Sequence, residues 1–331
     1  MKDLIQQLVE TTGPSGYESQ VRELVIKNIS KFSKDIKTDS MGNVIARMGT
    51  KKAGGSRIMV SAHMDEIGII ATHIDENGFI RFTTIGGVRA ANCIGGRVLF
   101  LNGARGVIFM EKLENPGHTP GFDQLYIDCG FSGRKDCTIT VGDMAVFDRP
   151  FTDLGNRVIS KAMDDRIGVA IQIEVMRQFK NSPHELVFVF STQEEVGLRG
   201  ATTSAYGVDP EIGLSIDVTL TGDTPKSIKM AVALGKGPAI KVRDGGMLAD
   251  PRLVKLMIDT AEKNSIPYQL EVLEGGTTDA KAIQLTRSGV PSGCVSIPCR
   301  YVHSPSEMVD MNDVENAIKL ILSLISSPID L

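Results

Sequence analysis

Histidine and carboxylate side chains, which bind divalent cations and move protons, follow several apolar segments of this chain. The first case is the run His63-Met64-Asp65-Glu66, directly after the apolar segment 57–62. On an extended backbone His63 and Asp65 point to the same side, so Asp65 can orient the ring of a metal-bound His63. The alternative is a histidine at a strand end whose acidic neighbours cap a helix.

Two further places hold adjacent acidic residues. Asp164 and Asp165 precede a segment in which apolar residues recur at helical spacing. One aspartate can cap that helix, which leaves the other free to bind a cation. Glu194 and Glu195 follow the apolar segment 186–190, and neighbours in an extended stretch face opposite sides. One glutamate can therefore ligate a cation while the other turns toward a water; a solvated pair in a loop is the alternative.

The remaining candidates are single groups. Asp217 closes the apolar segment 212–216, and His303 lies in a loop that contains Pro305. Each of them alone can be a core group with satisfied hydrogen bonds. Together with the other candidates they supply two imidazoles, three carboxylates and a spare glutamate, which fits two divalent cations that share one carboxylate. Imidazole and carboxylate without thiolate suit Zn, Co or Mn, and paired cations activate water for hydrolysis.

The pattern of apolar segments predicts the elements that position these side chains. Helical and strand segments alternate over residues 1–66 and 159–331, which predicts one α/β catalytic domain that is split in the sequence. Residues 67–158 contain short β-rich runs separated by glycine turns, which predicts an inserted all-β domain. We expect a largely parallel sheet whose ligand site lies outside the carboxyl ends of its strands.

The composition narrows the function classes. The chain has 36 Lys and Arg against 40 Asp and Glu, a net charge of -4, so we expect no nucleic-acid partner, because such proteins carry a basic surplus. No apolar run reaches about 18 residues, and we expect no membrane span. Asp3 and Glu10 stand where a signal peptide needs a basic and then an apolar region, so we expect a cytoplasmic protein. Five cysteines without a CxxC pair argue against a disulfide framework and a thiolate zinc site.

Beyond these single motifs, the chain resembles the tetrahedral or glutamyl aminopeptidases, a family of dinuclear metallo-exopeptidases of bacteria and archaea. The resemblance covers nearly the whole chain and rests on motifs that match in order and spacing. These motifs are Gly13-Pro14-Ser15-Gly16-Tyr17-Glu18, Ala62-His63-Met64-Asp65-Glu66-Ile67-Gly68, Asp164-Asp165-Arg166, Glu194-Glu195-Val196-Gly197-Leu198-Arg199-Gly200, Asp217 and the His303 loop. It implies an α/β/α sandwich of the metallo-exopeptidase type with an inserted, barrel-like β domain.

Carried over residue by residue, the resemblance also implies roles in the site. One metal would be held by His63, Asp164 and Asp217, and the other by Asp164, Glu195 and His303. Asp164 is then the bridge, Glu194 is the general base, and Asp65 is the partner of His63. The peptide bond after the bridging aspartate is cis in related enzymes. We expect two divalent ions per subunit, Zn or Co, with Mn as an alternative.

The resemblance further implies partners. Substrates would be short peptides, and residues 67–158 would form dimers that assemble into a homododecamer. The chain departs from the family at Gly275-Gly276-Thr277-Thr278-Asp279-Ala280-Lys281, where the family has Gly-Gly-Thr-Asp-Ala-Gly. This segment is either a helix start capped by Thr278 or Asp279 or a substrate contact, and the preferred amino-terminal residue stays open.

Three other functions remain open. A metal-dependent deacylase of N-acyl amino acids would use the same set of ligands. Some relatives are labelled endoglucanases, although most glycosidases use a pair of carboxylates without a metal. A non-catalytic assembly protein would be expected to have lost at least one of the ligand or general-base side chains, and all of them are present.

Overall fold

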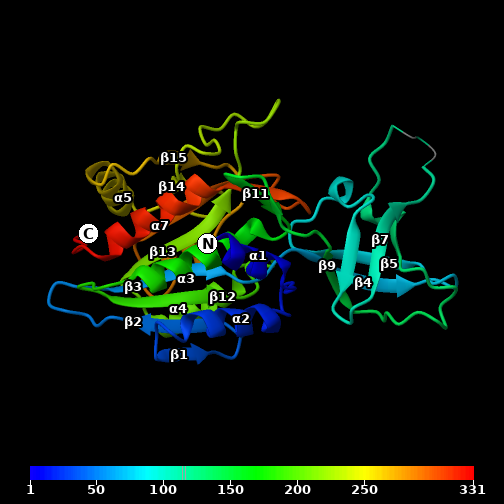
Figure 1. Ribbon diagram of the computed structural model, residues 1–331, viewed down its shortest axis with the longest axis horizontal. Coiled ribbons are helices and arrows are strands. Elements are labelled where there is room, and N and C mark those ends of the chain that lie inside the picture. Colours follow the sequence, from blue (N-terminus) through cyan, green and yellow to red (C-terminus); the bar gives the residue numbers. More distant parts are fainter. Residues whose placement is uncertain (114, 116) are drawn as a thin grey trace.

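The computed structural model describes residues 1–113, 115 and 117–331. Figure 1 shows a larger body, in which helices cover a sheet, and a smaller part built mostly from strands at one end of the molecule. The chain enters the smaller part after β3 (Arg57–His63) and returns to the larger body at β10 (Thr152–Asp153).

A mixed sheet of eleven strands forms the centre of the larger body. Besides β3 and β10, its strands are β1 (Asp35–Thr38), β2 (Val44–Met48), β11 (Arg157–Ser160), β12 (Glu185–Ser191), β13 (Ile212–Thr219), β14 (Ala239–Arg243), β15 (Gln269–Val272), β16 (Ser292–Arg300) and β17 (Glu307–Asp310). The main order is β1-β2-β12-β3-β13-β16-β17-β11-β10, and β14 pairs with β15 and β16. Strands β12, β3, β13 and β16 are parallel, whereas the outer strands of this order pair antiparallel. The expected parallel sheet is therefore confirmed in the centre and wrong toward the edges.

Helices cover both faces of this sheet. They are α1 (Lys2–Glu10), α2 (Ser19–Ile29), α3 (Met163–Gln178), α4 (Arg199–Val208), α5 (Pro251–Lys263), α6 (Asp279–Gln284) and α7 (Met311–Ile325). Neighbouring strand residues point to opposite faces, and Val60 accordingly packs in the core with α3 and α7, while Met59 packs in the core with α4 and α6. The three layers confirm the expected α/β/α sandwich.

A carboxylate directly before α7 caps this helix. The Asp310 carboxylate accepts the backbone N–H of Asn312 at 3.0 Å and caps the helix. Asp313 instead accepts the backbone N–H groups of Gly235 and Gly237, both at 2.7 Å. The strand β17 thus runs directly into α7 without a connecting loop.

The smaller part is a closed barrel in the order β4-β5-β8-β7-β6-β9. Its strands are β4 (Gly68–Ile74), β5 (Ile80–Ile85), β6 (Arg97–Phe100), β7 (Arg105–Met110), β8 (Leu125–Asp128) and β9 (Met144–Phe147). Its core is separate from that of the sheet and includes Ile69, Ile80, Val98 and Ile108. Closure leaves the barrel without a free edge. The division of the chain into a catalytic and a dimerisation domain stays a prediction.

None of the described helices combines the length and the apolar composition needed to cross a bilayer.

Candidate metal centre

The candidate side chains lie together at the carboxyl ends of the central parallel strands. His63 is the last residue of β3 and lies opposite Ser191, the last residue of β12, so Glu194 and Glu195 emerge beside it. Asp217 lies near the end of β13, the other neighbour of β3. Asp164 at the start of α3 and His303 in the loop between β16 and β17 lie close to the carboxyl ends of these strands. The parallel strands thus bring together residues that are far apart in the sequence.

The five predicted ligands form two overlapping groups. Within each group the ligand atoms lie within 4.8 Å of one another: the first group is His63, Asp164 and Asp217, and the second is Asp164, Glu195 and His303. Asp164 belongs to both, because its Oδ1 lies 3.0 Å from His63 Nε2 and its Oδ2 lies 3.4 Å from His303 Nε2. Glu195 Oε2 lies 3.2 Å from His303 Nε2.

This donor set fits divalent cations. Three carboxylates and two imidazoles without a thiolate are the ligands of Zn, Co or Mn centres. Glu195 Oε1 is buried and accepts no hydrogen bond from the described residues. Because a buried carboxylate oxygen without a partner is costly, this atom also favours a cation at the site.

The electrostatics of the site follow from the crowding of its charged side chains. Burial alone would raise the pKa of Asp164, but hydrogen bonds with His303 and His63 outweigh it and lower that pKa below its usual range. Burial opposes the charge on His303, yet Asp164 and Glu195 raise the pKa of its imidazole to about 12. Because His303 holds its proton tightly, a cation that binds through this imidazole must displace that proton.

Asp165 has a different environment from Asp164. Its Oδ1 accepts the backbone N–H of Gly168 at 3.1 Å, and its Oδ2 accepts that of His63 at 3.3 Å. Asp165 thus holds the first turn of α3 and the end of β3 with its carboxylate, and it is in neither ligand group. The Asp164–Asp165 peptide bond is cis, as the resemblance implies.

Asp65 contacts more than the ring of His63. His63 Nδ1 lies 3.1 Å from the backbone oxygen of Asp65 and 3.4 Å from its carboxylate Oδ1. The carboxylate accepts the backbone N–H groups of Glu194 and Glu195 at 3.0 and 3.2 Å, and the Ser15 hydroxyl at 2.6 Å. Asp65 therefore orients His63 mainly through its main chain, and it fixes the backbone that carries both glutamates.

Glu194 lies beside the ligand groups and in neither of them. Its Oε2 is 3.9 Å from His63 Nε2, and its side chain is 11% exposed. Burial raises the pKa of Glu194 well above its ordinary value, the His63 charge opposes this, and the carboxylates of Asp217 and Glu195 add to it. A raised pKa suits a general base that operates near neutral pH.

Arg166, the third residue of the Asp-Asp-Arg motif, is fully buried. Its guanidinium donates to the carbonyl oxygens of Leu8, Thr11 and Met64 at 2.5, 2.8 and 2.6 Å. Met64 stands between His63 and Asp65, so Arg166 ties the main chain of that motif to the N-terminal segment.

Two contributions to the site have no clear signal in the sequence. The Glu307 carboxylate accepts the backbone N–H groups of Asp164 and His303. The glycine pair Gly86-Gly87, which follows the barrel strand β5, packs on the second ligand group: a Cβ on Gly87 would lie 2.3 Å from His303 Nδ1. Sequence patterns indicate Gly86-Gly87 only as a turn, because the contact depends on how the barrel sits against the sheet.

The segment 275–281 begins a helix. Thr278 caps α6 by accepting the backbone N–H of Ala280 at 3.3 Å, as one of the two interpretations predicts. The buried Asp279 carboxylate accepts the hydroxyl of Ser191 at 2.5 Å and also that of Ser61, so it links the ends of β12 and β3 below the ligands.

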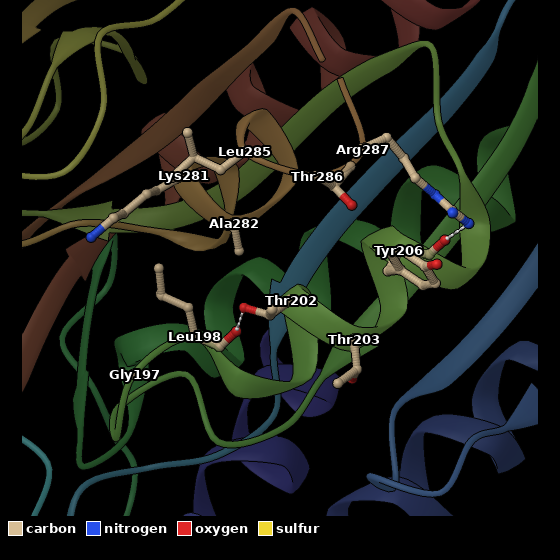
Figure 2. A pocket seen from close by; sticks show the side chains of 10 residues that line it. All are labelled: Gly197, Leu198, Thr202, Thr203, Tyr206, Lys281, Ala282, Leu285, Thr286 and Arg287. Atoms are coloured by element: carbon tan, nitrogen blue, oxygen red, sulfur yellow. Dashed lines mark hydrogen bonds between the residues drawn. The ribbon is translucent and has the colours of Figure 1, made fainter. Parts of the chain in front are cut away.

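A shallow groove of about 610 Å³ runs between α4 and α6 (Figure 2). It begins at Gly197 and Leu198, which continue the chain from Glu195, and none of the predicted site residues lines it. At its far end Arg287 stacks on the Tyr206 ring at 3.5 Å. The Lys281 side chain extends away from the other lining residues in Figure 2 and packs on Gly246.

Comparisons with known proteins agree with this geometry. Residues 42–320 match the M42 glutamyl aminopeptidase family. The lysyl aminopeptidase of Pyrococcus furiosus is 35% identical, and the alignment covers 98% of this chain and 96% of that protein. An aminopeptidase of the archaeon Desulfurococcus kamchatkensis superposes with a TM-score of 0.94 at 41% identity, covering 98% and 94% of the two chains. The TET1 peptidase of Pyrococcus horikoshii superposes at 0.89 with 33% identity and 98% coverage of both. The chain therefore belongs to the M42 glutamyl aminopeptidase family and is a peptide hydrolase.

Proposed function

We propose that this peptide hydrolase is an aminopeptidase with a dinuclear metal centre. In this centre His63, Asp164 and Asp217 hold one cation, while Asp164, Glu195 and His303 hold the other. The observation that carries the proposal is the place of Asp164 in both ligand groups, with one carboxylate oxygen toward each histidine. A carboxylate common to both groups would let one side chain serve two neighbouring cations, and such a pair would activate a water for hydrolysis.

When bound, two cations would supply an activated water and a positive field for the charge that develops on the scissile carbonyl. Glu194 takes the proton from the attacking water and passes it to the leaving amine. The carboxylate of Asp65 keeps Glu194 in place through the backbone N–H bonds described above. Burial of His63, Asp164 and Asp217 limits the water that competes with the reaction on the side of the first group.

Substrate size and assembly follow from the similarity to shell-forming relatives. The TET1 peptidase is described as assembling into a tetrahedron or a large octahedral shell. We extend this to dimers that assemble into a homododecamer, with residues 67–158 as the dimerisation domain and short peptides as substrates. Sedimentation at micromolar concentration tests the assembly: a monomer would contradict this part alone.

The Glu194→Gln variant tests the catalytic part. The variant should retain both metals, which elemental analysis measures, while kcat on aminoacyl amides falls by at least about 100-fold, the lower range for loss of a general base. A variant with near-wild-type turnover would contradict the role of Glu194. A series of Leu, Glu, Asp and Lys amides, each assayed with Zn, Co and Mn, would also define the preferred residue and metal.

The deacylase alternative needs a separate assay. A peptide with a free amino terminus and its N-acetylated twin are compared at equal concentration. An aminopeptidase cleaves the free peptide and leaves the acetylated one intact, whereas preferential release of acetate would favour the deacylase.

A further inference from the structure

Buried carboxylates hold the main chain of almost every residue of the proposed centre. Each of these bonds runs from a backbone N–H of a site residue to a carboxylate that is not itself a ligand. The pairs are His63 with Asp165, Glu194 and Glu195 with Asp65, and Asp164 and His303 with Glu307. These bonds fix the backbone of each residue and thereby the position of its side chain. Such contacts around the ligands tune metal sites in proteins.

Glu307 differs from Asp65 and Asp165 because it connects two proposed ligands that are far apart in the sequence. Its Oε2 accepts the N–H of Asp164 at 3.0 Å, and its Oε1 accepts that of His303 at 2.8 Å. These two residues lie 139 positions apart in the sequence, and Glu307 is only 1% exposed. Because each oxygen of the Glu307 carboxyl group serves one N–H, both bonds need a side chain that presents two oxygens to the two donors at the same time.

We infer that Glu307 is a positioning residue that sets the distance between the shared ligand Asp164 and the terminal ligand His303, and thereby the affinity of the second cation. This inference rests on the proposed dinuclear centre. The first group keeps His63 and Asp217, which Glu307 does not touch. The second group contains both residues that Glu307 holds, so a change at Glu307 acts on the second cation most strongly.

The substitution Glu307→Gln would disturb one of the two backbone contacts and leave the size of the side chain unchanged. The glutamine amide has one oxygen and one NH2 group, so it can accept only one of the two N–H donors and sets its own donors against the other. Either His303 or Asp164 then loses its anchor. Loss of an outer partner of a metal ligand lowers metal affinity by about 10–100-fold.

The experiment is a calorimetric titration of metal-stripped protein with Zn or Co, together with elemental analysis of the loaded protein. The variants are Glu307→Gln, which keeps the size, and Glu307→Asp, which keeps the carboxyl group but is too short to reach both N–H groups. The matched control is Asp313→Asn, because buried Asp313 also accepts two backbone N–H groups, from Gly235 and Gly237, and neither belongs to a ligand. Far-UV circular dichroism in EDTA checks that each protein is folded.

We expect two tight ions for the wild type and for Asp313→Asn, and one tight ion plus a second weakened at least tenfold for both Glu307 variants. Unchanged affinity for the second ion in a folded Glu307 variant would overturn the inference, and so would equal weakening of both ions. If Glu307→Gln fails to fold, Glu307→Asp decides. A wild type that binds no ion pair would instead refute the dinuclear centre itself.

Discussion

The neighbouring residues Asp164 and Asp165 offer a sharp test of the proposed centre, because they have the same side chain and opposite surroundings. Asp164 faces two imidazoles, whereas Asp165 faces two backbone N–H groups. We therefore predict that Asp164→Asn removes metal binding and that Asp165→Asn removes fold stability.

The magnitudes follow from these contacts. At an ion concentration of about 100 times Kd, each bound ion adds about 2.7 kcal/mol to the free energy of unfolding, so two ions add about 5 kcal/mol. Asp164→Asn deprives both sites of a ligand and should lose almost all of this gain. Asp165→Asn leaves one buried N–H without its acceptor and weakens the first turn of α3, which should cost about 1–3 kcal/mol with or without metal.

The assay is urea unfolding of each protein, followed by far-UV circular dichroism, once in EDTA and once with saturating Zn or Co. The difference between the two conditions measures metal-linked stability, and the EDTA curve measures the fold. A metal-dependent gain that survives in Asp164→Asn, or one that disappears in Asp165→Asn, would refute the assignment of the bridge.

Two further changes probe the barrel contact and a buried carboxyl group. Gly87→Ala places a methyl group 2.3 Å from the present position of His303 Nδ1, so we expect calorimetry to show an affinity for the second ion that is about 10–100-fold lower. The control is Gly207→Ala, where a Cβ meets no atom within 4 Å. Unchanged affinity in Gly87→Ala would contradict the role of this contact. Burial raises the pKa of Asp313 from 3.8 to about 6. The folded state then binds this proton more tightly than the unfolded chain, so its contribution to stability is complete below pH 4 and is lost as the pH rises through 6. Relative to Asp313→Asn in EDTA, the wild type should lose up to about 3 kcal/mol of unfolding free energy between pH 4 and pH 7, and a constant difference would disprove the shift.

Three of the side chains in the proposed centre, His63, Glu195 and Asp217, can be predicted from the sequence because each follows a recognisable apolar segment. Buried strands of a parallel sheet end at a common edge, so the apolar segments alone predict that His63, Glu195 and Asp217 meet. The structure does bring them together with Asp164 and His303. The choice between Asp164 and Asp165 depends on family resemblance, since the residues alone allow either one to cap or to bind.

Contacts with the main chain cannot be predicted from the pattern of apolar segments. Glu307 acts on backbone N–H groups, which every residue except proline has, so no residue type in its partners reveals it. The antiparallel edges of the sheet and the Asp310 cap of α7 are also beyond the pattern, because strand direction at an edge depends on loops that carry no periodic signal. The role of Gly87 needs the relative placement of two separate cores.

The contact between Gly86-Gly87 and the second ligand group has a thermodynamic consequence. The glycines come from the barrel, while Glu195 and His303 come from the sheet, and a Cβ on Gly86 would lie only 2.9 Å from Glu195 Oε2. In the proposed centre, occupancy of the second cation and the orientation of the barrel would therefore be linked equilibria, and linkage is reciprocal. A contact that fixes the barrel in this orientation, such as association with another subunit, would then change the affinity for that cation by the same factor by which the cation changes the strength of the contact.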